Sequence, residues 1–273
     1  MRANDGVDIS GDLAQALNVK YILVSVITLF VYDVVIFIPD ETRCIWQQRW
    51  SFGKAFYILA RYGCFIDVAA ILWYSFTTSH SLATCHTAYD FITWAAFCGT
   101  VICHLVLILR TYAIWNRNIF VLAYLFLLVF TAVVISIFEL NESNESIIFL
   151  PSTSIVPCAS TLTNNKMFLL YCFVSAVELN VVVLSLIKGI SHWRKNSSIL
   201  VHTLFRDGVL YFAVLFSISI TNVIFMLKMP KSPYYDAIAV PQRVLHSVLA
   251  SRVILNWLDN DASHALSRGA GRK

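Results

Sequence analysis

Charged side chains are scarce in this sequence: lysine, arginine, aspartate and glutamate together make up 13% of its 273 residues. A soluble protein typically has about 25% charged residues. Hydrophobic residues make up 58% of the chain, and the charges gather in short segments between long apolar runs. This distribution excludes an ordinary water-soluble domain and is typical of a membrane protein with several spans.

The sequence also lacks the short motifs that indicate familiar chemistry. It contains no phosphate-binding loop, no H-E-x-x-H and no nucleophile motif, so we expect no enzyme activity. Its seven cysteines form no C-x-x-C pair and no zinc-ligand spacing, so neither a metal nor a cofactor is expected. The net charge of +4 comes without a continuous basic stripe, which argues against nucleic acid as a partner.

What the sequence has instead is seven apolar runs long enough to cross a bilayer, which takes about 20 helical residues. These runs cover residues 21–38, 55–77, 88–113, 119–138, 167–190, 209–229 and 237–257. We therefore predict an all-α fold, a polytopic bundle of seven transmembrane helices over residues 21–257. A tail at 1–20 precedes the bundle and a tail at 258–273 follows it. Because a proline suits a helix boundary, Pro39 is expected to end the first helix.

The distribution of lysine and arginine predicts the orientation of the bundle. One side carries Arg43, Arg49, Lys54, Arg110, Arg117, Lys188, Arg194, Lys195, Arg206, Arg268, Arg272 and Lys273. The other side carries Arg2, Lys20, Lys166, Lys228 and Lys231. The richer side is expected to be cytoplasmic, which places the N-terminus outside and the C-terminus inside. We expect the protein in the plasma membrane, with an endomembrane as the alternative.

The longest outer loop agrees with this orientation. It begins with two N-glycosylation acceptor sequences, at Asn141 and Asn144, which can be modified only on the lumenal side. Among the cysteines, Cys85 and Cys158 alone lie in or next to outer loops. Since the outside is oxidising, a disulfide between these two is predicted. It would tie the long loop to the outer end of the third span.

Polar side chains inside the spans need a partner or water, because an unpaired charge at mid-bilayer costs about 2.5–3.5 kcal/mol on insertion scales. Asp33 lies at a depth similar to that of Arg61 and Arg252, so an inner ion pair with one of these arginines is expected. Deeper or farther out lie six more candidates: Asp67, His104, Glu178, Asn222, Arg243 and His246. The first three are expected near mid-membrane, and the two on the last span in its outer half. They either link helices or line a ligand cavity, and the sequence leaves both interpretations open.

Residues 31–67 read VYDVVIFIPDETRCIWQQRWSFGKAFYILARYGCFID. This segment resembles the signature of a family of uncharacterised basidiomycete fungal membrane proteins, domain of unknown function six-five-three-three, at about residues 21–67. The matching residues are Tyr32, Asp33, Glu41, Trp46, Trp50, Lys54, Arg61 and Tyr62. Further matches are Leu107–Asn118, Arg206–Phe212 and Ser251–Asn256. The resemblance implies seven helices and a fungal source, and no known activity.

The layout is also similar to that of G-protein-coupled receptors. Arg110 and Tyr112 fall where such receptors carry an arginine at the inner end of helix three, although no acidic residue precedes Arg110. With Arg117 they are candidates for contact with a cytosolic signalling partner. The resulting hypothesis is a receptor-like protein that binds a small or lipidic ligand within the bilayer. The alternatives are a transporter or channel that uses the intramembrane polar residues, and a structural membrane protein.

Overall fold

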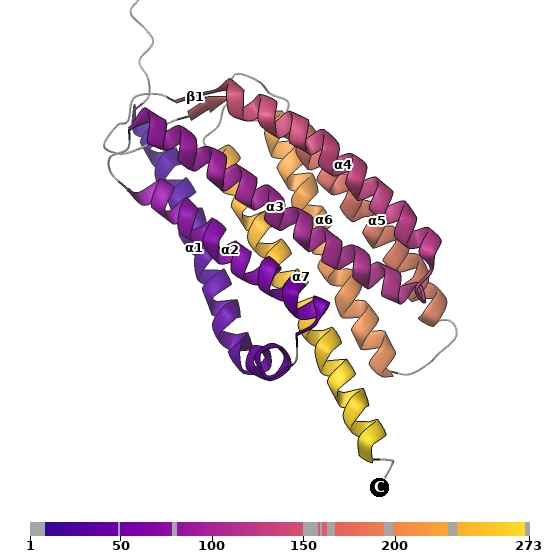
Figure 1. Cartoon of the computed structure of the whole chain (residues 1–273). Helices are drawn as coiled ribbons and strands as arrows, with labels where there is room; N and C mark the ends of the chain where they lie inside the picture. The colour runs from indigo at the N-terminus through magenta and orange to yellow at the C-terminus, as the bar shows by residue number, and fades with distance from the viewer. Residues whose placement is uncertain are drawn as a thin grey trace, which may run out of the picture.

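Figure 1 shows the computed structural model of the chain, which describes residues 9–48, 50–77, 81–149, 158, 160–162, 167–193, 199–228 and 234–270. Its helices are α1 (Ile9–Glu41), α2 (Phe52–Phe76), α3 (Leu82–Ile114), α4 (Ile119–Ser146), α5 (Met167–Trp193), α6 (Ile199–Lys228) and α7 (Tyr234–Ala270). A short π-helix, η1 (Thr42–Trp46), follows α1, and two short strands, β1 (Ile147–Phe149) and β2 (Ser160–Leu162), lie between α4 and α5. The predicted all-α class is confirmed.

Three helices begin at a polar side chain that caps the first turn. Ser51 accepts a hydrogen bond from the Lys54 backbone N–H at 3.2 Å, and Ser81 accepts one from the Thr84 N–H at 3.2 Å. Asn118 caps α4 in a similar way. The first N–H groups of a helix have no partner within it, so these caps determine where α2, α3 and α4 begin.

The prediction that Pro39 ends the first helix is wrong. Pro39 lies inside α1, which runs to Glu41 and continues directly into η1. A proline disturbs the helical turn before it rather than the turn after it, so a helix can continue where packing holds the following residues. Here Cys44 and Ile45, in η1, are buried against the bundle.

The two acceptor sequences were expected in a loop, and this placement is also wrong. Asn141 and Asn144 lie in the last turns of α4. The Asn144 side chain is buried, and its Nδ2 donates a hydrogen bond to Thr93 Oγ1 of α3 at 3.2 Å. Packing of this kind against α3 extends α4 beyond its apolar run.

Five of the described helices are long and apolar enough to cross a membrane: Ala14–Trp46, Phe52–Phe76, Leu82–Ile114, Ile119–Ser146 and Phe168–Gly189. A shorter apolar segment, Phe212–Lys228, lies in α6. Large apolar side chains are exposed on α1 and α4, as expected for helices that face lipid. The chain is therefore an integral membrane protein with several spans.

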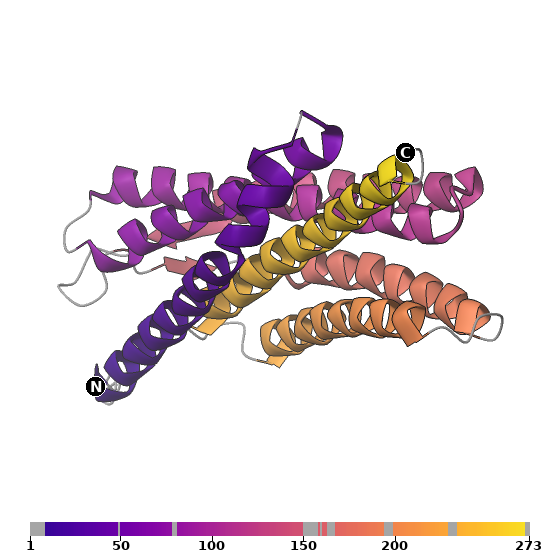
Figure 2. The same ribbon diagram turned by 90° about the horizontal axis from the view of Figure 1, so that it is seen from below.

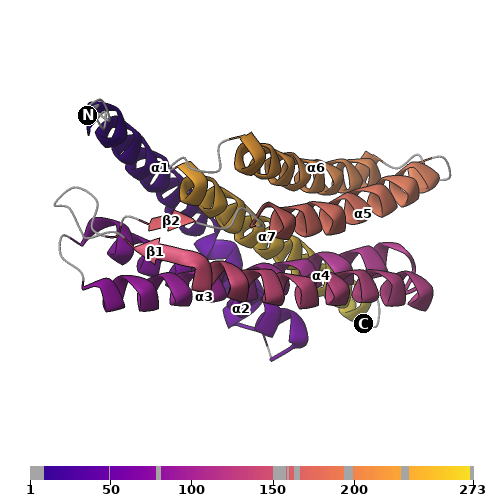
Figure 3. The same ribbon diagram turned by 90° about the horizontal axis from the view of Figure 1, so that it is seen from above.

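Helix α7 runs through the middle of the bundle. It packs against α1, α2, α3 and α6. Seen from below, α2, α3 and α4 form one row, α5 and α6 lie opposite, and α7 crosses between them (Figure 2). The view from above agrees (Figure 3). Buried apolar residues of α7, among them Val244, Leu249 and Ile254, belong to three separate core clusters, so α7 joins the parts of the fold.

The disulfide predicted between Cys85 and Cys158 is present, with the two Cα atoms 5.7 Å apart. Cys85 lies in the first turn of α3, and Cys158 lies between the antiparallel strands β1 and β2. Phe149 of β1 also makes an edge-on contact with the ring of Tyr89 on α3. The bridge and this contact hold the short hairpin against one end of α3.

Candidate functional site

The candidate site is a set of polar side chains on α7 that face several neighbouring helices. Gln242, Arg243, His246 and Ser247 are all buried, with at most 5% of each residue exposed. A helix has 3.6 residues per turn, so these neighbours point toward different sides of α7. We use the term middle layer for these four residues and for their side-chain partners Asp67, His104, Glu178, Ser219 and Asn222.

The first link of the middle layer is an ion pair between α7 and α2. Arg243 Nε donates to Asp67 Oδ2 at 2.7 Å. The Arg243 guanidinium also approaches Cys103 Sγ on α3 at 3.8 Å. Gly99, one turn earlier on α3, leaves room for it, because a Cβ at this position would collide with the guanidinium. Both charged groups are buried, so the pair is a strong constraint on how α2 and α7 are placed.

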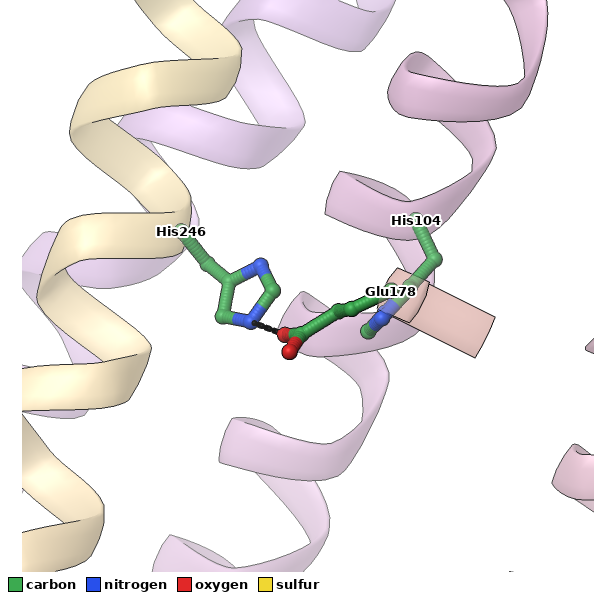
Figure 4. Close-up of side chains that lie close together, drawn as sticks. All are labelled: His104, Glu178 and His246. Atoms are coloured by element: carbon green, nitrogen blue, oxygen red, sulfur yellow. Dashed lines mark ion pairs between the residues drawn. The ribbon is translucent and has the colours of Figure 1, made fainter. Parts of the chain in front are cut away.

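The second link joins α3, α5 and α7 (Figure 4). Glu178 Oε1 lies 2.8 Å from His246 Nε2. The His104 ring is tilted against the His246 ring, with the ring centres 5.0 Å apart. One ligand atom of each residue lies within 4.8 Å of the others, so His104, Glu178 and His246 could together hold a metal ion.

A third link joins α7 to α6 and α2 through uncharged groups. Asn222 Nδ2 donates to Gln242 Oε1, and Gln242 Nε2 donates to Ser219 Oγ at 2.7 Å. On another side of α7, Ser247 Oγ donates to the Ala60 carbonyl of α2 at 2.8 Å. The middle layer therefore connects α7 by polar contacts to α2, α3, α5 and α6.

A second group of charges, the inner layer, consists of Asp33, Glu41, Arg61 and Arg252. Arg252 of α7 donates from Nε to Asp33 Oδ1 at 3.0 Å and contacts the same oxygen through Nη2. Arg61 Nη1 lies 3.8 Å from Asp33 Oδ2, and Arg61 Nε lies 3.3 Å from Glu41 Oε2. The sequence offered Arg61 or Arg252 as the partner of Asp33, and the structure brings both to it.

Glu41 is the member of the inner layer that sequence reasoning missed. Besides Arg61, its Oε1 accepts hydrogen bonds from Tyr62 Oη at 2.6 Å and from Trp46 Nε1 at 3.1 Å. Lys54 Nζ lies over the Trp46 ring, 5.6 Å from its centre. The sequence did contain a signal for Glu41, because Glu41 and the residues that contact it belong to the signature segment of residues 31–67.

The contacts also show how residues on different predicted spans are aligned with one another. Arg243 and His246 were placed in the outer half of the last span, whereas Asp67 and Glu178 were placed near mid-membrane. Direct contacts of Arg243 with Asp67 and of His246 with Glu178 put all four residues at one level. Helix α7 begins before its predicted span and runs on to Ala270, so Arg243 and His246 lie in its first half and meet residues in the interior of α2 and α5.

Candidates for partner contact lie at the end of α3. The Arg110 guanidinium packs over the Phe212 ring of α6, 5.1 Å from its centre. Tyr112 is half-buried, and Arg117 is exposed in the turn after α3, with a φ of 60°. Trp115, in the same turn, donates to the Leu184 carbonyl of α5 at 3.2 Å. Arg117 is thus presented on a turn that is fixed to α5.

Residues missed by sequence reasoning include Gln242 in the middle layer and Gly99, which lies against the Arg243 guanidinium. Gln242 adjoins Arg243, and an amide beside an intramembrane arginine could have marked it. Gly99 carries no such signal, because its role appears only when the Arg243 side chain is placed across the bundle.

The apolar helices around buried ionic layers define an integral membrane protein with several spans. Within this class, residues 21–66 match the family of unknown function DUF6533, so the family signature read from the sequence is confirmed for this segment. The matched segment contains Asp33, Glu41 and Arg61 of the inner layer. No curated protein and no solved structure gives a match.

Proposed function

We propose that this protein is a receptor-like membrane protein with seven spans, in which a small or lipidic ligand changes the position of α7. The observation that carries the proposal is the set of polar contacts on α7. This helix is linked by side-chain hydrogen bonds or ion pairs to α1, α2, α3, α5 and α6. In a membrane, polar contacts depend strongly on direction, so α7 has a few discrete positions rather than a continuous range.

The orientation belongs to the same proposal. Among the described residues, Arg43, Lys54, Arg110 and Arg117 lie at the helix ends away from the disulfide, which supports an oxidising outer side and a cytoplasmic inner side. The N-terminus is then outside and the C-terminus inside. Protease access to tags at the two ends of intact cells tests this orientation, and equal access at both ends would contradict it.

A ligand acts on such a bundle by binding one arrangement more tightly than another. The middle layer lies farther from the cytoplasm than the inner layer, and Arg243 and Arg252 are separated by about 13–14 Å along α7. A ligand that reaches the middle layer from outside would therefore move the inner end of α7 against Asp33. The inner face next to that end, which carries Arg110 and Arg117, would meet a cytosolic partner.

The charged groups favour this proposal over a transporter or channel. A permeation path requires polar groups distributed along the membrane normal. The buried ion pairs of the described chain fall in two layers, and Asp67, Glu178 and Asp33 each contact an arginine or a histidine. Between the layers α7 buries Leu249 and Ala250 together with Ser251, whose hydroxyl donates to the Ser247 carbonyl of the same helix at 2.7 Å.

The proposal is tested in liposomes that contain the purified protein and a panel of ions and small solutes. We expect no flux with the wild type. Flux that Asp67→Asn or Glu178→Gln abolishes would refute the receptor-like function and favour a transporter.

The complementary measurement is recruitment of cytosolic proteins to the same liposomes when lipids and small molecules are added. We expect a compound that recruits a partner to the wild type and not to Arg117→Ala. Lys20→Ala removes a cation on the opposite side and serves as the matched control. Equal loss in both variants would contradict a specific inner-face contact.

A further inference from the structure

We infer that His104, Glu178 and His246 form a site for a divalent transition-metal ion, and that Zn²⁺ fits it best. The three residues come from α3, α5 and α7. His104 and Glu178 lie more than seventy positions apart along the chain. Each is buried, with at most 5% of the residue exposed. Figure 4 shows the carboxylate of Glu178 lying between the two imidazole rings.

His104 is oriented as a metal ligand. Its Nδ1 lies 2.9 Å from the backbone carbonyl oxygen of Thr100. A carbonyl oxygen only accepts hydrogen bonds, so in the neutral ring Nδ1 carries the proton and Nε2 carries the lone pair. Nε2 is buried and has no hydrogen bond within the part of the chain that the structure describes. Metal-binding histidines commonly donate their other ring N–H to a carbonyl or carboxylate in this way.

Glu178 supplies the negative charge. Its carboxylate lies against the His246 ring and the Ser219 hydroxyl, but neither oxygen has a hydrogen bond of normal geometry among the described residues. The Arg243 guanidinium, which comes from the same helix as His246, is paired with Asp67 at 2.7 Å. A buried carboxylate without a permanent cation is costly, and a divalent ion would neutralise it while using the lone pairs of both histidines.

The geometry requires small movements. In a tetrahedral site with metal–ligand distances of about 2.0–2.1 Å, ligand atoms lie about 3.3 Å apart. The ligand atoms here lie within 4.8 Å of one another, and the closest pair, His246 Nε2 and Glu178 Oε1, is 2.8 Å apart. Rotations of the Glu178 side chain and of the two rings can supply the difference without moving a helix.

The ligand set indicates which ion the site takes. Two imidazoles and one carboxylate suit zinc and its neighbours in the first transition row, whereas magnesium and calcium prefer oxygen ligands. Iron(II) sites with these ligands keep several open positions. The burial of all three residues leaves less room, which fits zinc with a single open fourth position. This inference does not depend on the receptor-like function, since a metal could tie α3, α5 and α7 together in any membrane protein.

The test begins with the metal content of the full chain, purified in detergent through a tag without histidine and dialysed against a weak chelator. We expect about one zinc per chain in the wild type and at least a tenfold loss in His104→Gln and in Glu178→Gln. His86→Gln is the matched control, because His86 lies on the same helix, is exposed and pairs with Asp90. Equal zinc content in His104→Gln and the wild type would overturn the site.

A second measurement keeps the test decisive if the variants fold poorly. Wild-type protein stripped with a strong chelator should regain thermal stability when Zn²⁺ is added, and Mg²⁺ should not replace it, because a ligand that binds only the folded state raises its stability. X-ray absorption should show nitrogen and oxygen ligands at about 2.0–2.1 Å and no sulfur at about 2.3 Å. The inference would be contradicted if the wild type retained no zinc and gained no stability from added Zn²⁺. Sulfur ligands in the X-ray absorption spectrum would also contradict it.

Discussion

The two ionic layers of the bundle pair their buried charged side chains in different ways. In the middle layer each carboxylate has one partner from another helix: Asp67 pairs with the Arg243 guanidinium, and Glu178 contacts the His246 ring. In the inner layer the contacts are shared, because Asp33 meets two arginines and Arg61 meets two carboxylates. The Arg252 side chain is also 32% exposed, whereas those of Arg243 and Asp67 are at most 5% exposed.

This difference indicates what each layer can do. A shared network tolerates the loss of one member, because the remaining charges still have partners, and such redundancy suits a structural role. In a single buried pair, one charge is left without a partner when the other residue is replaced or moves. This sensitivity suits a site that responds to a ligand or an ion. The following substitutions test the contrast, from the largest expected effect to the smallest.

Arg243→Met should have the largest effect. It leaves the Asp67 carboxylate buried without its partner, which typically costs about 3–5 kcal/mol of stability. We expect little folded protein, measured as the monodisperse fraction after detergent extraction and as the amount at the cell surface.

The control for this prediction is the double variant Asp67→Leu with Arg243→Met. Replacing both members of a buried pair by apolar side chains is often neutral or stabilising. If the double variant recovers folded protein, the loss in Arg243→Met is caused by the unpaired charge of Asp67. If the single and the double variant lose the same amount, that cause is contradicted.

Gly99→Ala should have the next largest effect. A Cβ on Gly99 collides with the Arg243 guanidinium, which Asp67 holds in place. Overpacking of this kind typically costs about 1–3 kcal/mol, and thermal unfolding in detergent would measure it. Gly63→Ala is the matched control, since a Cβ there meets Arg243 Nη2 at an ordinary 3.8 Å. A similar loss in both variants would refute the proposed role of Gly99.

Asp33→Ala should cost less than Arg243→Met. After this change Arg61 still contacts Glu41, and the partly exposed Arg252 can reach lipid phosphates. We expect a loss of about 1–3 kcal/mol, between the values for exposed and fully buried pairs. Thermal unfolding of Asp33→Ala and Arg243→Met under the same conditions checks which variant loses more stability. A larger loss of stability in Asp33→Ala would contradict the expected order.

Tyr62→Phe should have the smallest effect of the four. It removes one hydrogen bond to Glu41, which keeps its contacts with Trp46 and Arg61. The expected loss is about 0.5–1.5 kcal/mol, the usual net contribution of a hydrogen bond. Tyr32→Phe, at an exposed position of α1, is the control and should leave the melting temperature unchanged.

Much of the architecture could be predicted from the sequence, because the signals are local. Apolar runs predicted the helices and the membrane class, and the positions of Cys85 and Cys158 relative to the predicted sides predicted their disulfide. Helix ends were less predictable. Pro39 and the Asn144 sequence both lie inside helices that packing against the bundle prolongs, and a single sequence contains no direct record of that packing.

The candidate site was predictable as a set of residues but not as a set of pairs. Asp67 and Arg243 are separated by 176 positions, and which helix faces which cannot be read from apolar runs that face either lipid or protein. The metal-binding interpretation was missed for a related reason. His104, Glu178 and His246 come from three helices, so no local ligand spacing exists.

The contrast between the layers is tested most directly by two double-mutant cycles, measured by reversible unfolding in mixed detergents. One cycle combines Asp67→Ala with Arg243→Ala, and the other combines Asp33→Ala with Arg252→Ala. The account predicts a coupling energy above about 2 kcal/mol for the buried single pair and below about 1 kcal/mol for the shared, partly exposed pair. Equal couplings, or a stronger coupling between Asp33 and Arg252, would contradict it.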